Sequence, residues 1–423
     1  MSDSSTTPDQ GAVPQPPPPP TPAGEPVLTP DGAPPGGPRV IDTENQDLAD
    51  GVNRCPKCGS TDIQLRVSTG MLVCLFCRNE WAEAAIDPLV SGEASLADLT
   101  GTVIASGAAD IDAAAAQVLT LKCSGCGSEV VVNIAEATSS RCHWCRHVLT
   151  VNEQVPNGAV PDAVLPFAIT RDDALTRIRE FAGKRRMFAH RRFLKEFVPE
   201  NVVGAYLPYM VVDSRASADL HGHGEVLIRR YTRGTGDNKE TYYDADVYRI
   251  ARRVDFTADD LTLESSAARA DMNTVVNTNN VINTILPFDT EKAVRWNANY
   301  LVGFTSERRD QDVAALVPEL EHQLLSIARS EARGSVSAYD RGVRWESEGL
   351  EVHGTRWVSM YLPVWLYSYY EQDKSMVHYI AVNGRTGETM GSVPVSQGRL
   401  LAAAITVGSI LEVFAIAIVG AAS

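Results

Sequence analysis

Eight cysteines in four C-x-x-C pairs are the residues of this sequence whose type and spacing best suit chemistry. In the first module the fifteen residues 59–73 separate CPKC from CLFC, and in the second the fifteen residues 127–141 separate CSGC from CHWC. Each pair can form a knuckle that points two sulfurs at one metal, and a following glycine supplies backbone freedom. The pattern predicts two Zn²⁺ sites of four cysteines each: Cys55, Cys58, Cys74 and Cys77, then Cys123, Cys126, Cys142 and Cys145.

Four thiolates close the coordination shell of a metal, whereas a catalytic zinc keeps one position open for water or substrate. Both sites are therefore expected to be structural. Iron in a rubredoxin-like site is the main competitor of zinc, because it uses the same four thiolates. His143 and His147 flank the second module and could substitute as ligands, although four cysteines are already available there. Since thiolate ligands must stay reduced, we expect the cysteines to face the cytosol.

Motifs for other chemistry are absent from the sequence. It contains no phosphate-binding Walker A loop, no H-E-x-x-H zinc motif and no G-x-S-x-G nucleophile elbow. His221 and His223 would share one face of a strand, but they supply only two ligands, and the glycines beside them fit a bulge or hairpin equally well. We therefore predict that the protein is not an enzyme.

A basic stretch, KRRMFAHRRFLK, spans residues 184–195 and includes two phenylalanines. Three interpretations stay open: a solvated helix face, a surface for anionic lipid or an acidic partner, and a site that stacks the bases of single-stranded nucleic acid. The formal net charge of −15 disfavours general nucleic-acid binding, which depends on a basic footprint. The candidate binding residues are Lys184, Arg185, Arg186, Arg191, Arg192 and Lys195.

The C-terminal residues 400–422 are apolar and carry Glu412 as their single charged residue. A helix of this length, at about 1.5 Å per residue, can cross a hydrocarbon core of about 30 Å. The segment predicts a transmembrane anchor over residues 399–423, with Arg399 at its cytoplasmic flank and the bulk of the chain in the cytoplasm. The alternative is a helix buried in a subunit interface. Glu412 opposes insertion and would have to face another helix or take up a proton.

The elements that must position the cysteines indicate an α+β fold with antiparallel sheets. LPF motifs at 165–167 and 286–288 each precede a helix-like stretch and a YLP strand, which suggests an internal repeat. Apolar residues at helical spacing predict helices over 175–197 and 314–332. The predicted division is a disordered Pro-rich tail at 1–50, zinc ribbons at 51–85 and 120–155 joined by a linker at 86–119, α+β repeats at 160–284 and 285–398, and the anchor at 399–423.

Residues 120–423 resemble the bacterial TFIIB-type zinc-ribbon-containing proteins of the YdjG-like kind. The resemblance rests on CSGCG and CHWC, VLPFAIT, YLPYMVVDS, YLPVWLYSYY, and VNGRTGETMGSVPVS before the apolar tail. It implies a membrane-associated protein of phage-shock-type envelope-stress systems, with PspA-like partners. The Pro-rich head and the first cysteine module lie outside what the resemblance covers, and Glu412 departs from a clean anchor.

These observations favour a non-enzymatic, zinc-stabilised scaffold. We expect it to be anchored at the cytoplasmic face of the cell membrane through residues 399–423 and to recruit protein partners, PspA-like ones by resemblance. Self-association into a homo-oligomer is compatible with this expectation. The alternative is a nucleic-acid-binding zinc-ribbon protein related to replication or transcription factors.

Overall fold

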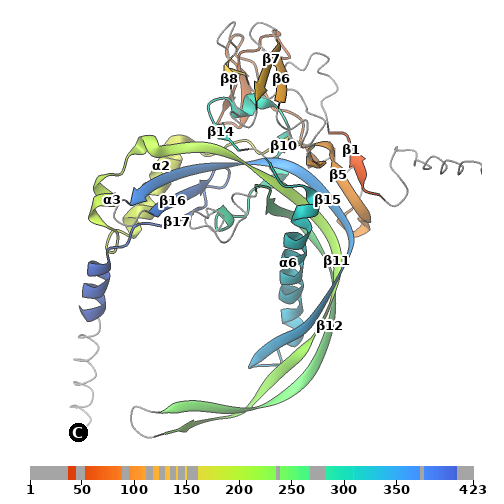
Figure 1. Cartoon of the computed structure of the whole chain (residues 1–423), viewed down its shortest axis with the longest axis vertical. Helices are drawn as coiled ribbons and strands as arrows, with labels where there is room; N and C mark the ends of the chain where they lie inside the picture. Colours follow the sequence, from red (N-terminus) through yellow and green to blue (C-terminus); the bar gives the residue numbers. More distant parts are fainter. Residues whose placement is uncertain are drawn as a thin grey trace, which may run out of the picture. The chain divides into compact units, whose positions relative to one another are not determined.

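The computed structural model of the chain is shown in Figure 1. It describes residues 37–43, 53–87, 95–110, 118–122, 129–133, 140–141, 148–149, 161–234, 239–266, 282–307, 309–371 and 376–406. The chain divides into two compact units, Met1–Gly37 and Pro38–Ser423, and the elements below belong to the second unit. The Pro-rich tail predicted at 1–50 therefore lies largely outside the described residues.

One long sheet dominates the structure, so the predicted α+β class is wrong. Strands predominate over helices among the described residues, which makes the fold mostly β. The sheet has ten strands. They are β1 (Arg39–Ile41), β5 (Gly101–Ala105), β10 (Ala163–Val164), β11 (Val202–Arg233), β12 (Glu240–Glu264), β13 (Val294–Arg295), β14 (Thr305–Ser306), β15 (Gly342–Glu371), β16 (Met376–Asn383) and β17 (Thr389–Gly391).

The smaller sheets belong to the two cysteine modules. In the first module β2 (Ile63–Arg66), β3 (Met71–Cys74) and β4 (Glu80–Trp81) form a three-stranded antiparallel sheet. In the second, β6 (Val118–Lys122) pairs with β7 (Glu129–Asn133), and β8 (Ser140–Arg141) pairs with β9 (Val148–Leu149). The segment predicted as a linker also carries structure, because β5 adds to the large sheet in parallel with β15.

The helices are fewer than the strands. The α-helices with described bounds are α2 (Arg171–Lys184), α3 (Arg191–Lys195) and α6 (Val313–Ala332). Helix α6 confirms the helix predicted at 314–332, whereas the one predicted at 175–197 is divided into α2 and α3. Short 3₁₀ turns are η1 (Leu96–Asp98), η2 (Ser106–Ala108), η3 (Pro199–Asn201), η5 (Thr290–Lys292), η6 (Ala298–Leu301) and η7 (Arg333–Val336).

Strands β11 and β15 form the centre of the large sheet. They run antiparallel, with Tyr206 opposite Pro363, Leu207 opposite Leu362 and Pro208 opposite Tyr361. Both strands are rich in β-branched and aromatic residues here, and both faces of this part are covered. One face packs Tyr206 against α2 residues such as Ile178, and the other packs Leu207 within a second hydrophobic cluster.

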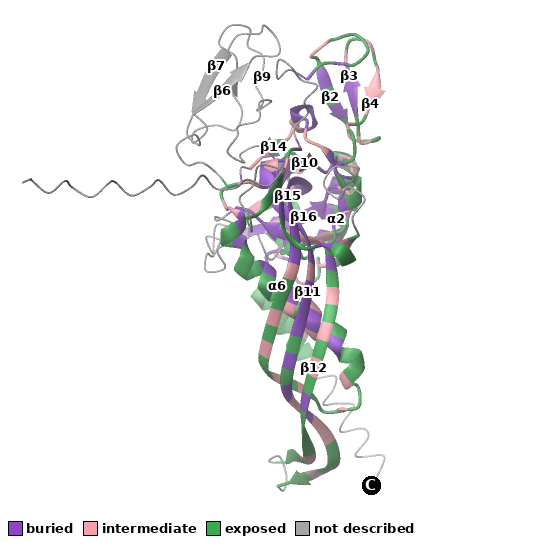
Figure 2. Cartoon of the chain, turned by 90° about the vertical axis from the view of Figure 1, so that its right-hand side faces the viewer, coloured by how far each residue is buried: buried purple, intermediate pink, exposed green. Residues whose placement is uncertain are grey.

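Beyond this centre β11, β12 and the first part of β15 continue as an arm. Burial along β11 alternates from Ala218 to Glu225, as expected for a sheet covered on one face. Helix α6 covers that face with a stripe of apolar residues, Leu316, Leu320, Leu324 and Ala328. Figure 2 shows burial giving way to exposure toward the end of the arm.

The predicted transmembrane anchor is overturned. Residues 397–406 are helical, and residues 407–423 lie outside the described part of the chain. No helix among the described residues is long and apolar enough to cross a membrane. The expectation of a membrane-spanning C-terminal helix is therefore withdrawn.

Candidate functional site

The first cysteine module folds into two equivalent knuckles. In the first, the backbone N–H of Cys55 donates to the Ser60 carbonyl at 2.8 Å, and in the second Cys74 donates to Asn79 at 2.9 Å. The residue after each C-x-x-C pair adopts a positive φ, +72° at Gly59 and +62° at Arg78. Glycine accepts this conformation without strain, so the prediction for Gly59 is confirmed, and Arg78 adopts it despite its Cβ.

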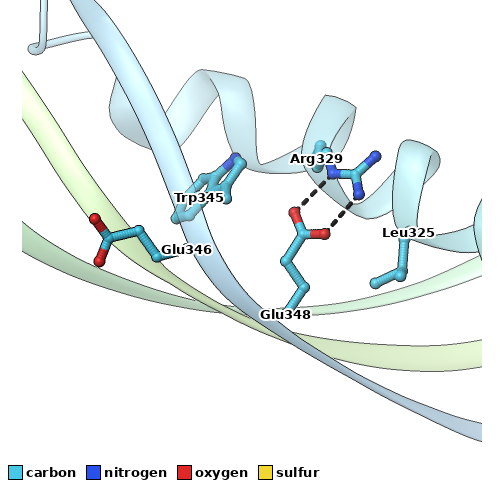
Figure 3. Close-up of a pocket in the computed structure, with 5 residues that line it drawn as sticks. All are labelled: Leu325, Arg329, Trp345, Glu346 and Glu348. Atoms are coloured by element: carbon cyan, nitrogen blue, oxygen red, sulfur yellow. Dashed lines mark hydrogen bonds and ion pairs between the residues drawn. The ribbon is translucent and has the colours of Figure 1, made fainter.

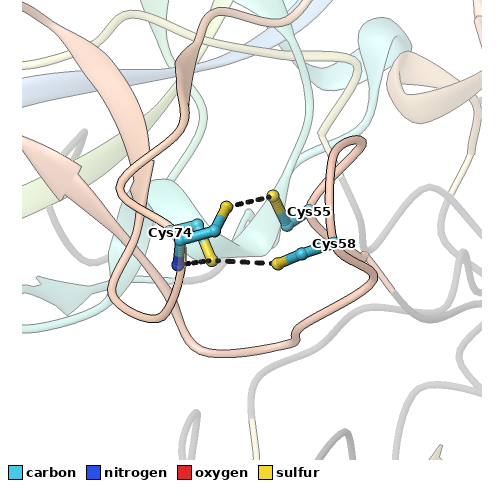
Figure 4. Close-up of side chains that lie close together, drawn as sticks. Cys55, Cys58 and Cys74 are labelled. Atoms are coloured by element: carbon cyan, nitrogen blue, oxygen red, sulfur yellow. Dashed lines mark hydrogen bonds between the residues drawn. The ribbon is translucent and has the colours of Figure 1, made fainter.

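The knuckles bring four thiols to one point (Figure 4). The Sγ atoms of Cys55 and Cys77 lie 3.6 Å apart, as do those of Cys58 and Cys74, and all four lie within 4.8 Å of one another. A tetrahedral zinc with Zn–S bonds of about 2.3 Å separates its sulfurs by about 3.8 Å. These four cysteines can therefore hold a metal ion of this size.

Two thiols of this cluster, those of Cys58 and Cys74, have strongly shifted pKa values. For Cys74, burial opposes ionisation, but the backbone N–H groups of Cys77 and Phe76 and the neighbouring thiols lower the pKa to about 6. For Cys58, the Ser60 backbone favours the thiolate, but burial and the other three thiols raise the pKa to about 12. Such a crowded set favours a bound cation, because a metal replaces the protons that the thiols otherwise share.

The first cysteine module shares its hydrophobic core with the large sheet. Ile63, Leu65 and Leu72 are buried in the same cluster as Tyr206 and Tyr300. The chain leaving the module is also bonded to the sheet, since the N–H of Arg295 donates to Ala84 at 2.7 Å. Asn297 donates from its amide to Glu83 at 2.8 Å. The module is therefore packed onto the sheet as an integral layer.

The second cysteine module is described only in its strands. Cys123, Cys126, Cys142 and Cys145, together with His143 and His147, lie outside the described residues. Each of its two strand pairs flanks one C-x-x-C pair, since Cys123 directly follows β6 and Cys142 directly follows β8. The second metal site stays a prediction.

The basic stretch at 184–195 lies on the surface, whereas its two phenylalanines differ in exposure, with Phe188 half-buried and Phe193 buried. Phe193 is buried and packs edge-on against Tyr369, with ring centroids 5.0 Å apart. Arg185 is engaged over the ring of Phe181 at 3.5 Å. Since base stacking needs exposed rings, Phe193 is not available for it. Lys184, Arg186, Arg191, Arg192 and Lys195 remain solvent-exposed.

His221 and His223 lie on the face of β11 that α6 does not cover. His223 contacts Glu346 at 3.0 Å. Within the described residues, the clusters of three or more metal-ligating side chains include neither histidine. They do not form a second metal centre with other described residues.

Sequence reasoning missed a cluster of carboxylates at a β-bulge. Asp213 of β11 stands opposite two residues of β12, Asp259 and Asp260, and the three carboxylates lie within 4.8 Å of one another. Burial and the neighbouring Asp213 raise the pKa of Asp259 to about 6. Arg356 donates from Nε to Asp213 at 2.8 Å and so supplies a positive charge. The signal in the sequence was Asp213 within an otherwise apolar strand.

A second buried carboxylate joins separate elements. Asp162 accepts the backbone N–H of Gly107 at 2.6 Å and that of Ser359 at 2.8 Å, and Thr43 donates to it as well. Burial raises the pKa of Asp162 to about 6, although these donors and Arg309 act in the opposite direction. The side chain ties η2 and β1 to β15.

A groove of about 430 Å³ lies between α6 and the first part of β15 (Figure 3). Trp345 and Leu325 supply apolar walls. Arg329 donates two hydrogen bonds to Glu348, of 2.7 and 2.5 Å, and this pairing lowers the pKa of Glu348. Among the described residues, 342–353 pair with β11 alone, so the other edge of β15 is open beside α6.

Comparison with known proteins gives one distant relative. Over 243 residues the chain is 22% identical to the uncharacterized protein YdjG of Bacillus subtilis (strain 168), a match covering 57% of this chain and 66% of that protein. The chain thus spans just under two thirds of the relative's length. No protein-family profile matches, and no solved structure matches. The phage-shock and membrane association implied by resemblance finds no support in these comparisons and is withdrawn.

Proposed function

We propose that the protein is a zinc-stabilised scaffold that recruits protein partners, with zinc bound by Cys55, Cys58, Cys74 and Cys77. A closed shell of four thiolates suits a structural ion. The sharing of hydrophobic core between this module and the sheet supports a role for the ion in holding the scaffold together.

The open edge of β15 beside α6 is the observation that carries the recruiting role. An unpaired strand edge offers a row of backbone donors and acceptors to an incoming extended segment. The neighbouring groove can accept alternate side chains of that segment, an apolar one against Leu325 and Trp345. The partner we infer is therefore an extended peptide segment with an apolar anchor residue.

Capture of the tagged full-length protein from cells tests this proposal when wild type is compared with Trp345→Ala and Glu346→Lys. Both variants alter the groove, and Glu346→Lys leaves the hydrophobic core untouched. Tyr370→Ala is the control, because Tyr370 is an exposed residue of the same strand outside the groove. We expect a partner retained by wild type and control and depleted about tenfold or more by both groove variants.

Binding is then measured with the purified partner, so that a direct contact is distinguished from co-purification. A dissociation constant that changes in the groove variants and not in Tyr370→Ala supports the proposal. A partner that binds all four proteins equally would place recruitment elsewhere and refute the groove.

Single-stranded nucleic acid is a second candidate ligand, favoured by the tip of the β11–β12 hairpin. There Arg229 and Arg233 lie 5.2 and 5.4 Å from the ring of Tyr231, which itself stacks on Tyr242. Cations interleaved with exposed rings can stack bases. Fluorescence polarisation with labelled oligonucleotides at low salt tests this idea, and absence of binding there would exclude it.

A further inference from the structure

Strand β12 has a long outer edge to which no other described strand is paired. It spans 25 residues, and among the described residues it pairs only with β11. Edge strands of monomeric proteins are usually short or interrupted by proline, lysine or a bulge. Residues 240–258 contain no proline, glycine or lysine. The bulge at Asp213 lies beyond them, and the second bulge of this pair places its extra residue, Ile228, in β11 and not in β12. An edge of this kind is a ready template for another strand.

The far part of the arm also lacks enough structure to be stable by itself. Strand β15 begins opposite Glu225, so β11 and β12 continue beyond it as a two-stranded ribbon. Isolated two-stranded ribbons are marginal in water. Large side chains are nevertheless exposed along β12, with fractional exposures of 41% for Tyr242, 60% for Val247 and 48% for Tyr248. A further strand paired with β12 would therefore stabilise this part of the arm.

We propose that two copies of the chain pair their β12 strands antiparallel, about a two-fold axis at Tyr248. A two-fold axis that joins two antiparallel edges runs normal to the sheet, so each side-chain face is preserved. Directly opposed residues must then be separated by an even number of positions. The axis must therefore pass through a residue paired with its own copy.

Charge selects the register among these choices. An axis at Asp246 or Arg249 places two like charges directly opposite each other, which is destabilising. An axis at Ile250 sets Glu240 opposite Asp260, and an axis at Val247 opposes no acid to a base. The axis at Tyr248 sets Asp244 opposite Arg252 of the second copy, twice by symmetry, and opposes no like charges.

The same register suits the uncharged positions. Tyr242 lies opposite Val254 of the second copy, Tyr243 opposite Arg253, and Tyr248 opposite its own counterpart. Within one chain Asp244 binds Arg229 at 2.6 Å, and Arg252 reaches the Ser335 hydroxyl at 3.1 Å. Pairing would thus extend existing polar networks across the axis. It also leaves the β15 groove untouched, because β11 separates β12 from β15.

Light scattering of the purified full-length protein tests the proposal first. We expect a mass twice that of the 45.8 kDa chain for wild type. Tyr248→Lys places two like charges on the axis and should yield monomers with unchanged far-ultraviolet circular dichroism. Tyr370→Lys, on an exposed tyrosine away from this edge, should stay dimeric. A monomeric wild type, or a dimer that Tyr248→Lys does not weaken, overturns the proposal.

Cysteine crosslinking tests the register. Tyr248→Cys lies opposite its own copy and should form a covalent dimer under mild oxidation. Tyr242→Cys is similarly exposed but lies opposite Val254, so it should crosslink only when mixed with Val254→Cys. Crosslinking of Tyr242→Cys with itself at the rate of Tyr248→Cys contradicts this register. The native cysteines are common to all variants, so differences between variants report the introduced thiols.

Discussion

Leu207 of β11 and Leu362 of β15 lie directly opposite each other at the centre of the large sheet. Each is the middle residue of a Tyr-Leu-Pro motif, so the two motifs pair with each other antiparallel. Both leucines are fully buried in one hydrophobic cluster, while Tyr206 and Tyr361 point to the opposite one. This paired centre is the platform on which the cysteine module and the arm are built.

The junction between the cysteine module and the sheet predicts unequal effects of two neighbouring substitutions. Leu72 is fully buried in the shared core, whereas Met71 is exposed. Leu72→Ala should lower the free energy of unfolding by about 2–5 kcal/mol because it opens a cavity. Met71→Ala is the control and should change it by about 0.5 kcal/mol or less. Denaturant unfolding of the zinc-loaded protein measures both values, and equal effects would argue against a shared core.

The metal content of the chain should respond to single ligands. Cys74→Ser removes one thiolate from the described cluster and should lower bound zinc from two equivalents per chain to one. Phe76→Ala changes an exposed residue between two ligands, so its metal content should match wild type. Elemental analysis after dialysis measures this. Iron in place of zinc, or no loss in Cys74→Ser, would contradict the assignment.

The ion pair of Arg356 with Asp213 is buried, so removal of one partner should cost more than removal of both. Asp213→Ala leaves the Arg356 guanidinium without its main counter-charge and should destabilise the fold by roughly 3–5 kcal/mol. The double variant Asp213→Leu with Arg356→Met replaces the pair by apolar groups and should lose less. Equal losses in chemical denaturation would show that the pair does not act as a unit.

Asp162 predicts a pH dependence of stability. Its pKa in the folded protein is about 6, above its ordinary value of 3.8, so the folded state binds the proton more tightly. The contribution of this proton to the free energy of unfolding is therefore complete below pH 3.8. It is lost as the pH rises through about 6, and the total loss is about 3 kcal/mol. The stability of wild type relative to Asp162→Asn should fall over this interval. A difference independent of pH would mean that Asp162 stays ionised throughout.

The sequence predicted the local features that depend on few residues. Spacing placed Cys55 and Cys74 in one possible metal cluster and Gly59 where the backbone needs freedom, because knuckle geometry is set by neighbours in the chain. Helix α6 followed from its apolar stripe. The predicted fold class was wrong because the apolar runs near Tyr206 and Tyr361 indicate that strands are present but do not indicate how long the strands are. Whether a strand continues for thirty residues depends on its partners in the sheet.

Contacts between residues that lie far apart in the chain could not be predicted from the sequence for the same reason. The carboxylates of Asp213 and Asp260 meet because a bulge shifts the register of β12, and no local pattern encodes that shift. Phe193 was read as a residue for base stacking, but it is buried against Tyr369, which lies far along the chain. The segment 86–119 looked like a linker because β5 is stabilised mainly by its pairing with β15.

Hydrogen exchange of the full-length protein, with zinc bound and after its removal, tests most directly the claim that the metal module is an integral layer of the fold. Zinc removal should raise exchange in residues 53–87 and also in the packed segments of the sheet body, 294–301 and 163–169. Exchange that rises only within 53–87, or nowhere, would contradict it.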